Sequence, residues 1–249
     1  MKRILLAGES WTSFTTHVKG FDSFFTATYG MGADDLIRVL KENGYEITYL
    51  NNEVAADQFP TMKTALQEYD LVILSDIGSN TLLLTHNTFT KGMITPNRCK
   101  LIREYVEEGG ALLMIGGYMS FTGIDAKARY GKTELAEVLP VSMLDCDDRV
   151  ERPEGIVPQI TNSGHPVVQG IKGEWPQFLG YNRVIAKPDS TVVAKFGADP
   201  FIVTGTYGKG RAAAFTSDCA PHWGSPEFVE WKYNKKLWGN LAGWLCKKA

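Results

Sequence analysis

Short apolar runs alternate with amphipathic segments along the first half of the chain. Four runs are typical of buried strands, and between them apolar residues recur at helical spacing, as over 33–43. Strands that alternate with helices indicate a parallel sheet covered by helices on both faces. The predicted strands are residues 3–7, 46–50, 71–75 and 111–115.

A further helix is predicted before the fourth strand. Thr95 is a suitable N-cap, and Pro96 fits the first helical turn, where its missing N–H costs nothing. Apolar side chains recur at helical spacing over 99–106, and Gly109-Gly110 ends the helix.

The second half of the chain has a different pattern. Short extended segments separated by Pro and Gly follow one another, and a β-hairpin is predicted over 201–211. We expect antiparallel strands added to the sheet edge, so that residues 1–249 form one domain with a β-rich extension at 141–205. The other predicted strands of this part are 141–144, 156–160, 182–186 and 191–196.

The chain ends in a predicted helix over 226–246, capped by Ser225. Its apolar stripe is expected to face the core or a second subunit. The stripe consists of Trp231, Trp238, Leu241 and Leu245.

Two connections, from Glu9 to Gly32 and from Asp76 to Thr95, are unusually long for a compact domain. Both are rich in aromatic and polar residues and do not have the composition of disordered segments. Both also leave the carboxyl ends of predicted strands. We therefore expect them to fold over a site as walls or lids.

Polar residues concentrate where the predicted strands end. The run 210–215 is followed by an acid, a thiol, an imidazole and an indole within the segment 216–223. Ligands of open α/β sheets bind at the carboxyl ends of strands, so this edge is the predicted site. The other polar strand ends are Gly8-Glu9-Ser10-Trp11, residues 75–80 and residues 116–120.

Composition narrows the function classes. The 249 residues are 44% hydrophobic and 22% charged, with a net charge of −2, which favours neither nucleic acid nor an anionic membrane as partner. No apolar run reaches the roughly 18 residues of a membrane span. The four cysteines are scattered without metal-ligand spacing, so we predict a reduced cytoplasmic compartment, no metal and no cofactor. The alternative is a cation held by Glu9, Asp76, Asp218 and His222, although these residues form no ligand-spacing motif.

The four strand ends together resemble the class I glutamine amidotransferase-like superfamily, and more closely a bacterial group of cytoplasmic amidotransferase-like proteins of unknown activity. The resemblance implies a flavodoxin-like three-layer α/β sandwich. It rests on Gly8-Glu9-Ser10-Trp11, residues 75–80, Ile115-Gly116-Gly117-Tyr118 with Ser120-Phe121, and residues 217–224.

The chain departs from the superfamily at its catalytic positions. Working members carry a cysteine nucleophile on the turn after the fourth strand, where this chain has Tyr118. A phenol is a poor replacement for a thiolate. Working members also have a His and a Glu two residues apart, whereas His222 and Glu227 here are five apart. Glutamine hydrolysis by the usual route is therefore not expected.

Cys219 is the strongest enzymatic candidate, since His222 follows three residues later and could lower the thiol pKa. The alternative is that Cys219 is a small buried hydrophobic residue. Asp218 either orients His222 or caps its own turn. His222 itself could act as a base, donate a hydrogen bond to a ligand, or pack beside Trp223.

Three hypotheses follow. In the first, the protein binds a small polar metabolite in a pocket at the strand ends. In the second, it is a hydrolase or transferase that uses Cys219, His222 and the Gly117–Tyr118 backbone. In the third, it is an inert homo-oligomeric assembly protein. The predicted pocket residues are Glu9, Ser10, Trp11, Asp76, Gly78, Ser79, Asn80, Gly117 and Tyr118, beside Asp218 and His222.

Overall fold

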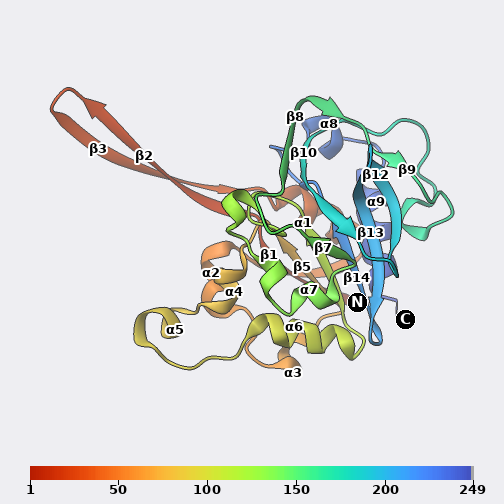
Figure 1. Cartoon of the computed structure of the whole chain (residues 1–249), viewed down its shortest axis with the longest axis horizontal. Helices are drawn as coiled ribbons and strands as arrows, with labels where there is room; N and C mark the ends of the chain where they lie inside the picture. The colour runs from red at the N-terminus through yellow and green to blue at the C-terminus, as the bar shows by residue number, and fades with distance from the viewer. Residues whose placement is uncertain (248–249) are drawn as a thin grey trace.

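The computed structural model describes residues 1–247 and contains an eight-stranded sheet with strand order β4-β1-β5-β6-β14-β13-β12-β9 (Figure 1). The first five strands are parallel. In chain order they run 2-1-3-4-5, the flavodoxin-like order. They are β1 (Lys2–Gly8), β4 (Tyr45–Leu50), β5 (Leu71–Ser75), β6 (Ala111–Ile115) and β14 (Gly210–Phe215).

The last three strands of the sheet form the predicted antiparallel extension. They are β13 (Asp199–Tyr207), β12 (Thr191–Phe196) and β9 (Gln159–Ile160). Two further antiparallel pairs lie outside this sheet, namely β8 (Arg149–Ile156) with β10 (Phe178–Asn182), and β7 (Val141–Met143) with β11 (Val184–Ala186). The predicted fold class is therefore confirmed, as is the hairpin, which is formed by β13 and β14.

Alternate side chains of the central strands enter two separate cores. On β1, Ile4 and Leu6 pack into one core with α1 (Asp34–Glu42) and α9 (Asn234–Leu245), whereas Leu5 and Ala7 pack into the other. The second core is lined by α2 (Asn52–Gln58), α3 (Lys63–Leu66), α4 (Ser79–Leu83), α6 (Arg98–Glu107) and α7 (Leu135–Val138). Because both strand faces are covered, these strands are continuous apolar runs.

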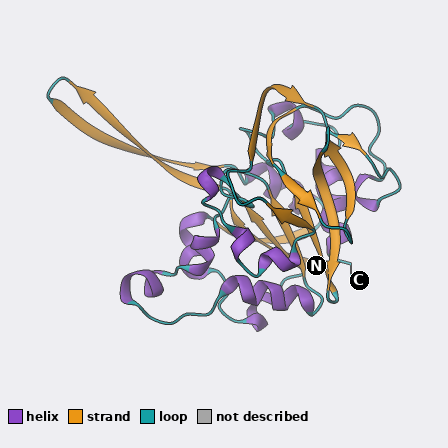
Figure 2. Cartoon of the chain, viewed as in Figure 1, coloured by secondary structure: helices purple, strands orange, loops and turns teal. Residues whose placement is uncertain are grey.

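The sequence predicted that the segment from Glu9 to Gly32 folds over the site as a wall or lid. This prediction was wrong. The segment forms a long antiparallel ribbon of β2 (Ser10–Lys19) and β3 (Asp22–Met31), which is hydrogen-bonded to the start of α2 at its base and projects from the body of the molecule beyond it (Figures 1 and 2). Threonine and aromatic residues, which favour strands, dominate it. Both of its faces are exposed, so it lacks the apolar–polar alternation of a half-buried strand.

The long connection 76–95 contains two short helices, α4 and α5 (His86–Lys91). The predicted start of the next helix, with Thr95 as its cap, was wrong. Helix α6 begins at Arg98, because Asn97 Oδ1 accepts a hydrogen bond from Lys100 N–H at 3.0 Å and caps the first turn. The side chain of Thr95 bonds to Thr88 at 2.6 Å instead.

The predicted C-terminal helix is divided into α8 (Pro226–Val229) and α9. The carbonyl of Phe228, where α8 ends, accepts both the N–H of Trp231 at 3.2 Å and the side-chain amide of Asn234 at 3.0 Å. The predicted cap is confirmed, since Ser225 Oγ accepts from Phe228 N–H at 3.2 Å. Trp238, Leu241 and Leu245 are buried in the core, while Trp231 is partly buried against it.

The predicted strands at 156–160 and 182–186 are each interrupted. Residue 156 ends β8 and residue 159 begins β9, which pair in different sheets. Arg183 separates β10 from β11. Its N–H donates to the Asp148 carbonyl at 2.6 Å, next to the β10–β8 pairs, whereas Val184 pairs with Met143 of β7. Short 3₁₀ turns occupy Ile124–Ala126 (η1), Tyr130–Lys132 (η2) and Pro166–Val168 (η3).

Phe178 is expected to contribute strongly to stability. Its ring is fully buried and contacts the rings of Phe196, Phe201, Phe215 and Phe228. The substitution Phe178→Ala should lower the free energy of unfolding by about 3–5 kcal/mol, because it leaves a cavity among these rings. Urea denaturation measures the change. The matched control is Phe89→Ala, whose ring is exposed, and which should change stability by less than about 0.5 kcal/mol.

Candidate functional site

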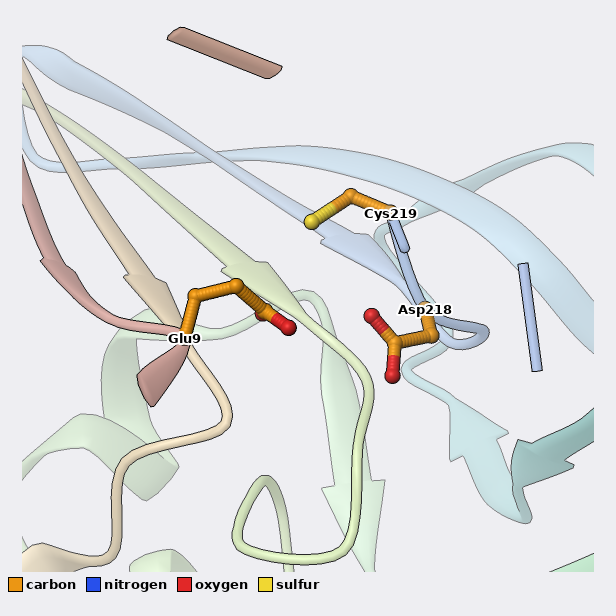
Figure 3. A group of neighbouring side chains, drawn as sticks. All are labelled: Glu9, Asp218 and Cys219. Atoms are coloured by element: carbon orange, nitrogen blue, oxygen red, sulfur yellow. The ribbon is translucent and has the colours of Figure 1, made fainter. Parts of the chain in front are cut away.

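The carboxyl ends of β1, β5, β6 and β14 meet at one edge of the sheet, because these parallel strands are consecutive neighbours. Glu9 follows β1, Asp76 follows β5, and Asp218 lies three residues beyond β14. Figure 3 shows the carboxyl groups of Glu9 and Asp218 directed toward each other, with Cys219 beside them. The predicted strand-end residues thus share one edge.

Two of these residues adopt an uncommon backbone conformation. Glu9 and Asp76 are left-handed, with φ of +53° and +43°. The N–H of Glu9 donates to the carbonyl of Ser75 at 2.7 Å, and this bond holds the end of β1 against the end of β5. Left-handed residues other than glycine cost on the order of 1–3 kcal/mol and occur preferentially at functional sites. Their position here supports this edge as the site.

The three carboxyl groups form one electrostatic unit. Glu9 and Asp218 are buried, whereas Asp76 is partly exposed. Burial, and then repulsion from Asp76, raises the pKa of Glu9 to about 7. Burial, followed by repulsion from Glu9 and Asp76, raises the pKa of Asp218 well above its usual value. Like charges this close do not all ionise, so the unit retains protons at neutral pH.

Glu9, Asp218 and Cys219 offer ligand atoms within 4.8 Å of one another, a spacing that could hold a cation. Such acidic groups are also common without a metal, and the hydroxyl of Ser75 donates to Glu9. Among residues 1–247, His222 does not join this group. The expectation that the protein uses no metal stays a prediction.

The turn after β6 is held by buried hydrogen bonds. The N–H of Gly117 donates to Asn182 Oδ1 at 3.0 Å, and the N–H of Met119 donates to Asp76 Oδ1 at 2.6 Å. A Cβ on Gly117, whose φ is +149°, would lie 2.8 Å from that carboxylate oxygen. The chain then continues through turns and not into a helix. In the hydrolase hypothesis, the backbone of Gly117 and Tyr118 would stabilise a negatively charged oxygen of the reaction. The N–H of Gly117 is already bonded to Asn182.

Sequence reasoning missed the side chains that fix this turn. The amide of Asn182 also donates to Asp148 Oδ1 at 2.8 Å, and both Asp148 oxygens accept backbone N–H groups, from Thr122 and Gly123, at 2.9 Å. Asn182 and Asp148 are buried. A polar residue at the end of an apolar segment, as in Phe178–Asn182, was the signal available for this pair.

Tyr118 belongs to a cluster of rings at the edge of the site. Its hydroxyl donates to Glu151 at 3.0 Å, the guanidinium of Arg149 lies 4.7 Å from its ring centre, and the ring of His222 lies 4.5 Å away. The indole of Trp223 donates to the other Glu151 oxygen at 2.9 Å. Burial and then Glu151 raise the pKa of Tyr118, so it stays a neutral phenol. Arg149 and Glu151 were not predicted.

Cys219 and His222 face different neighbours. The Cys219 thiol lies 3.8 Å from Ser75 Oγ, and burial, followed by the charges of Glu9 and Asp218, raises its pKa well above its usual value. His222 contacts Tyr118 and Trp223 with one side of its ring and exposes the rest to solvent. The partial burial of the ring is the main cause that lowers its pKa.

Catalysis by the Cys219–His222 pair therefore stays a prediction, with the thiol in an environment opposite to that of an activated nucleophile. Asp218 Oδ1 accepts a hydrogen bond from the N–H of Ala220 at 3.1 Å, so this carboxylate caps its own turn.

The other predicted pocket residues lie around this centre. Ser10 is buried and accepts a hydrogen bond from the N–H of Asn52 at 2.8 Å, and the exposed Trp11 lies at the base of the β2–β3 ribbon. Ser79 is buried behind the turn that begins at Gly78. Asn80 is exposed.

Asn80 lines a cavity of about 600 Å³. Met119 lines it as well, and the backbone of the same residue donates to Asp76, so the cavity adjoins the carboxyl unit. Its other lining residues are Thr122, Asp125, Ala126, Lys127, Arg129, Gly131, Lys132, Leu144 and Asp145.

The raised pKa of Glu9 predicts a pH dependence of stability. Below about pH 4.5, Glu9 is protonated in both the folded and the unfolded chain; between 4.5 and about 7 the folded chain holds the extra proton. Stability from this group therefore falls as pH rises through that window. We expect Glu9→Gln to gain on the order of 2 kcal/mol relative to the wild type between pH 5 and pH 7.5, measured by urea denaturation. A parallel pH profile for the two proteins would contradict this expectation.

The thiol environments predict different alkylation rates. Cys146 is exposed, whereas Cys219 is buried with a raised pKa. Iodoacetamide near pH 6.5 should label Cys146 at least about tenfold faster, because only the accessible thiolate reacts. Mass spectrometry of the two peptides measures the ratio. Fast labelling of Cys219 that is lost in His222→Ala would instead identify an activated nucleophile.

Comparison with known proteins identifies the family and agrees with the fold. Residues 3–247 match the family described as "Putative glutamine amidotransferase" (GATase1_like). The cytoplasmic protein STM3548 of Salmonella typhimurium is 47% identical, with TM-score 0.94, over 97% of this chain and 98% of that one. STM1381 of Salmonella typhimurium LT2, also named a cytoplasmic protein, is 48% identical, with TM-score 0.95, over 98% and 100%.

More distant likeness shows the fold alone. A ThuA-like protein from Bacteroides uniformis is 12% identical, with TM-score 0.53, over 96% of this chain and 91% of that one. None of the curated proteins matches the sequence. No helix among the described residues is long and apolar enough to span a membrane. Since the family match covers nearly the whole sequence, the chain belongs to the GATase1_like family of glutamine amidotransferase-like proteins.

Proposed function

We propose that this protein binds a small polar metabolite at the carboxyl ends of its central strands and does not hydrolyse glutamine through an elbow cysteine. The observation that carries the proposal is the convergence of Glu9, Asp76 and Asp218, whose pKa values are all raised. Buried charge without a partner is costly, and a ligand that satisfies these groups recovers part of that cost. The two cytoplasmic relatives support a cytoplasmic location.

The carboxyl unit favours one kind of ligand group. An ionised carboxylate only accepts hydrogen bonds, and a protonated carboxyl group still keeps an oxygen that accepts them, so the complementary ligand group is a donor, such as an amine or a hydroxyl. Asp76 is partly exposed, and Tyr118 and His222 lie at the accessible edge. A ligand therefore reaches Asp76 first, with Glu9 and Asp218 beneath it.

The adjoining cavity limits the size of the ligand and offers it a second contact with the protein. About 600 Å³ is within the range of metabolite pockets. Two of the lysines in its lining are paired with acids, Lys127 with Asp125 at 2.8 Å and Lys132 with Asp145 at 2.6 Å. Arg129 is exposed in the same lining and suits an acidic group of the ligand.

The position of Tyr118 also supports binding without the usual chemistry. The phenol replaces the superfamily's cysteine, and it donates its proton to Glu151. The neighbouring N–H groups of Gly117 and Met119 are bonded to Asn182 and Asp76. A nucleophile and a free oxyanion donor are both needed for acyl transfer.

A thermal-shift screen with amino acids, amino sugars and polyols tests the proposal, followed by titration calorimetry of any ligand found. Asp76→Asn and Asp218→Asn should each weaken binding at least about tenfold, the expected loss for a charged hydrogen bond. Glu174→Gln changes an exposed carboxylate outside the site and should bind as the wild type does. Equal affinity in all four proteins, or release of ammonia from glutamine by the wild type, would contradict the proposal.

A further inference from the structure

The ribbon of β2 and β3, residues 10–31, is here called the arm. Its strands pair with each other over ten residue pairs, from Ser10 with Met31 to Lys19 with Asp22, and with no other strand of the described chain. Ten residues per strand span roughly 30 Å. Figure 1 shows the arm extending away from the body, so neither core covers it.

The arm exposes large apolar side chains on both of its faces. Phe14 is 79% exposed, Phe25 is 74% exposed, and Phe21 at the turn is fully exposed. An isolated two-stranded ribbon is at best marginally stable in water, because it has no core to bury. The other exposed apolar residues of the arm are Trp11, Val18, Phe24, Tyr29 and Met31.

The exposed apolar area is concentrated on one face of the arm. By the register of the strands, this face carries Phe14, Val18, Phe25, Tyr29 and Met31, while Trp11 and Phe24 lie on the other face. At the roughly 150–250 Å² of one aromatic side chain, the first face exposes on the order of several hundred Å². Apolar patches of this size on a soluble chain are characteristic of interaction sites, and the added pairing of strand edges brings the contact toward the roughly 800 Å² that each partner buries in a standard interface.

The edges of the arm lack the usual protection against strand pairing. Natural edge strands carry prolines, charges or bulges that prevent another strand from adding to them. Residues 10–31 contain no proline, and the register of the arm has no bulge. Its two formal charges, Lys19 and Asp22, face each other next to the turn and cancel. The edges are therefore free to accept a further strand.

The charge of the arm selects the kind of partner. Nucleic acid and anionic membranes require clusters of Lys and Arg, whereas the arm carries a single lysine that is balanced by Asp22. A second arm offers a matching surface of aromatic and threonine side chains and a matching pair of open edges. Two-fold symmetry then buries the same patch on both partners, as in most homo-oligomers.

From these observations we propose that the arm is the oligomerisation element of the protein, and that its partner is the arm of a second copy of this chain. The association buries the aromatic side chains of both arms and pairs their open edges. This proposal is independent of the ligand proposed above, because it rests on a surface outside the carboxyl unit.

Sedimentation velocity at roughly 50 µM, above the weak end of affinities for interfaces of this size, tests the proposal. The wild type should sediment as a dimer or larger oligomer, and the double variant Phe14→Lys/Phe25→Lys as a monomer. Both residues are exposed and lie outside the two cores, so the helical circular dichroism and the main unfolding transition of the body should match those of the wild type. The matched control, Phe89→Lys, changes an equally exposed phenylalanine on α5 and should remain oligomeric.

Three outcomes would overturn the proposal. The first is that the wild-type chain is a monomer in the absence of vesicles. The second is that the wild type is an oligomer, but the arm variant remains an oligomer too or the control Phe89→Lys becomes a monomer. The third is a monomeric wild type that co-sediments with phosphatidylcholine–phosphatidylglycerol vesicles through its arm, which would make a lipid surface the partner. Replacement of residues 12–29 by a short Gly-Ser turn gives an independent variant, and it should also be monomeric.

Discussion

Three carboxyl groups held together at a buried sheet edge are the constraint on which the site depends. The parallel order β1-β5-β6-β14 brings the strand ends together, and the left-handed turns at Glu9 and Asp76 keep both residues there. At neutral pH this arrangement must share protons, because full ionisation of neighbouring buried acids is too costly. The raised pKa values follow from this placement, and the proposed ligand is inferred from it.

The turn after β6 is tied to three other parts of the chain. Tyr118 donates to Glu151, the N–H of Gly117 donates to Asn182, and the N–H of Met119 donates to Asp76. These hydrogen bonds fix the turn beside the carboxyl groups, and they are the contacts on which the proposal of binding without glutamine hydrolysis rests.

Sequence patterns predicted the buried part of this fold well. The strands Leu71–Ser75 and Ala111–Ile115 were predicted with their observed bounds, since burial on both faces makes them continuous apolar runs. That polar residues gather at one edge of the sheet was predicted for the same reason, because they directly follow such runs. The division of the last helix was missed, because the bonds that close α8, from Trp231 N–H and the Asn234 side chain to the carbonyl of Phe228, are not revealed by spacing.

The features that sequence reasoning missed are long-range or two-sided. The arm has no buried face, so its strands lack a periodic pattern. Asn182 and Asp148 lie 34 residues apart and meet only through the fold. Glu151 joins Tyr118 to Trp223 from β8, a strand outside the main sheet. Contacts of this kind follow from tertiary packing and carry no local signal.

The central claim is that Glu9, Asp76 and Asp218 titrate as one unit. A carbon-13 NMR titration of the side-chain carboxyl carbons between pH 3 and pH 9, repeated with Asp76→Asn, tests it directly. The account predicts that Glu9 titrates near pH 7 in the wild type, and that removal of the Asp76 charge lowers the pKa of Glu9. Independent titration of all three groups near pH 4, the ordinary range for carboxyl groups, would contradict it.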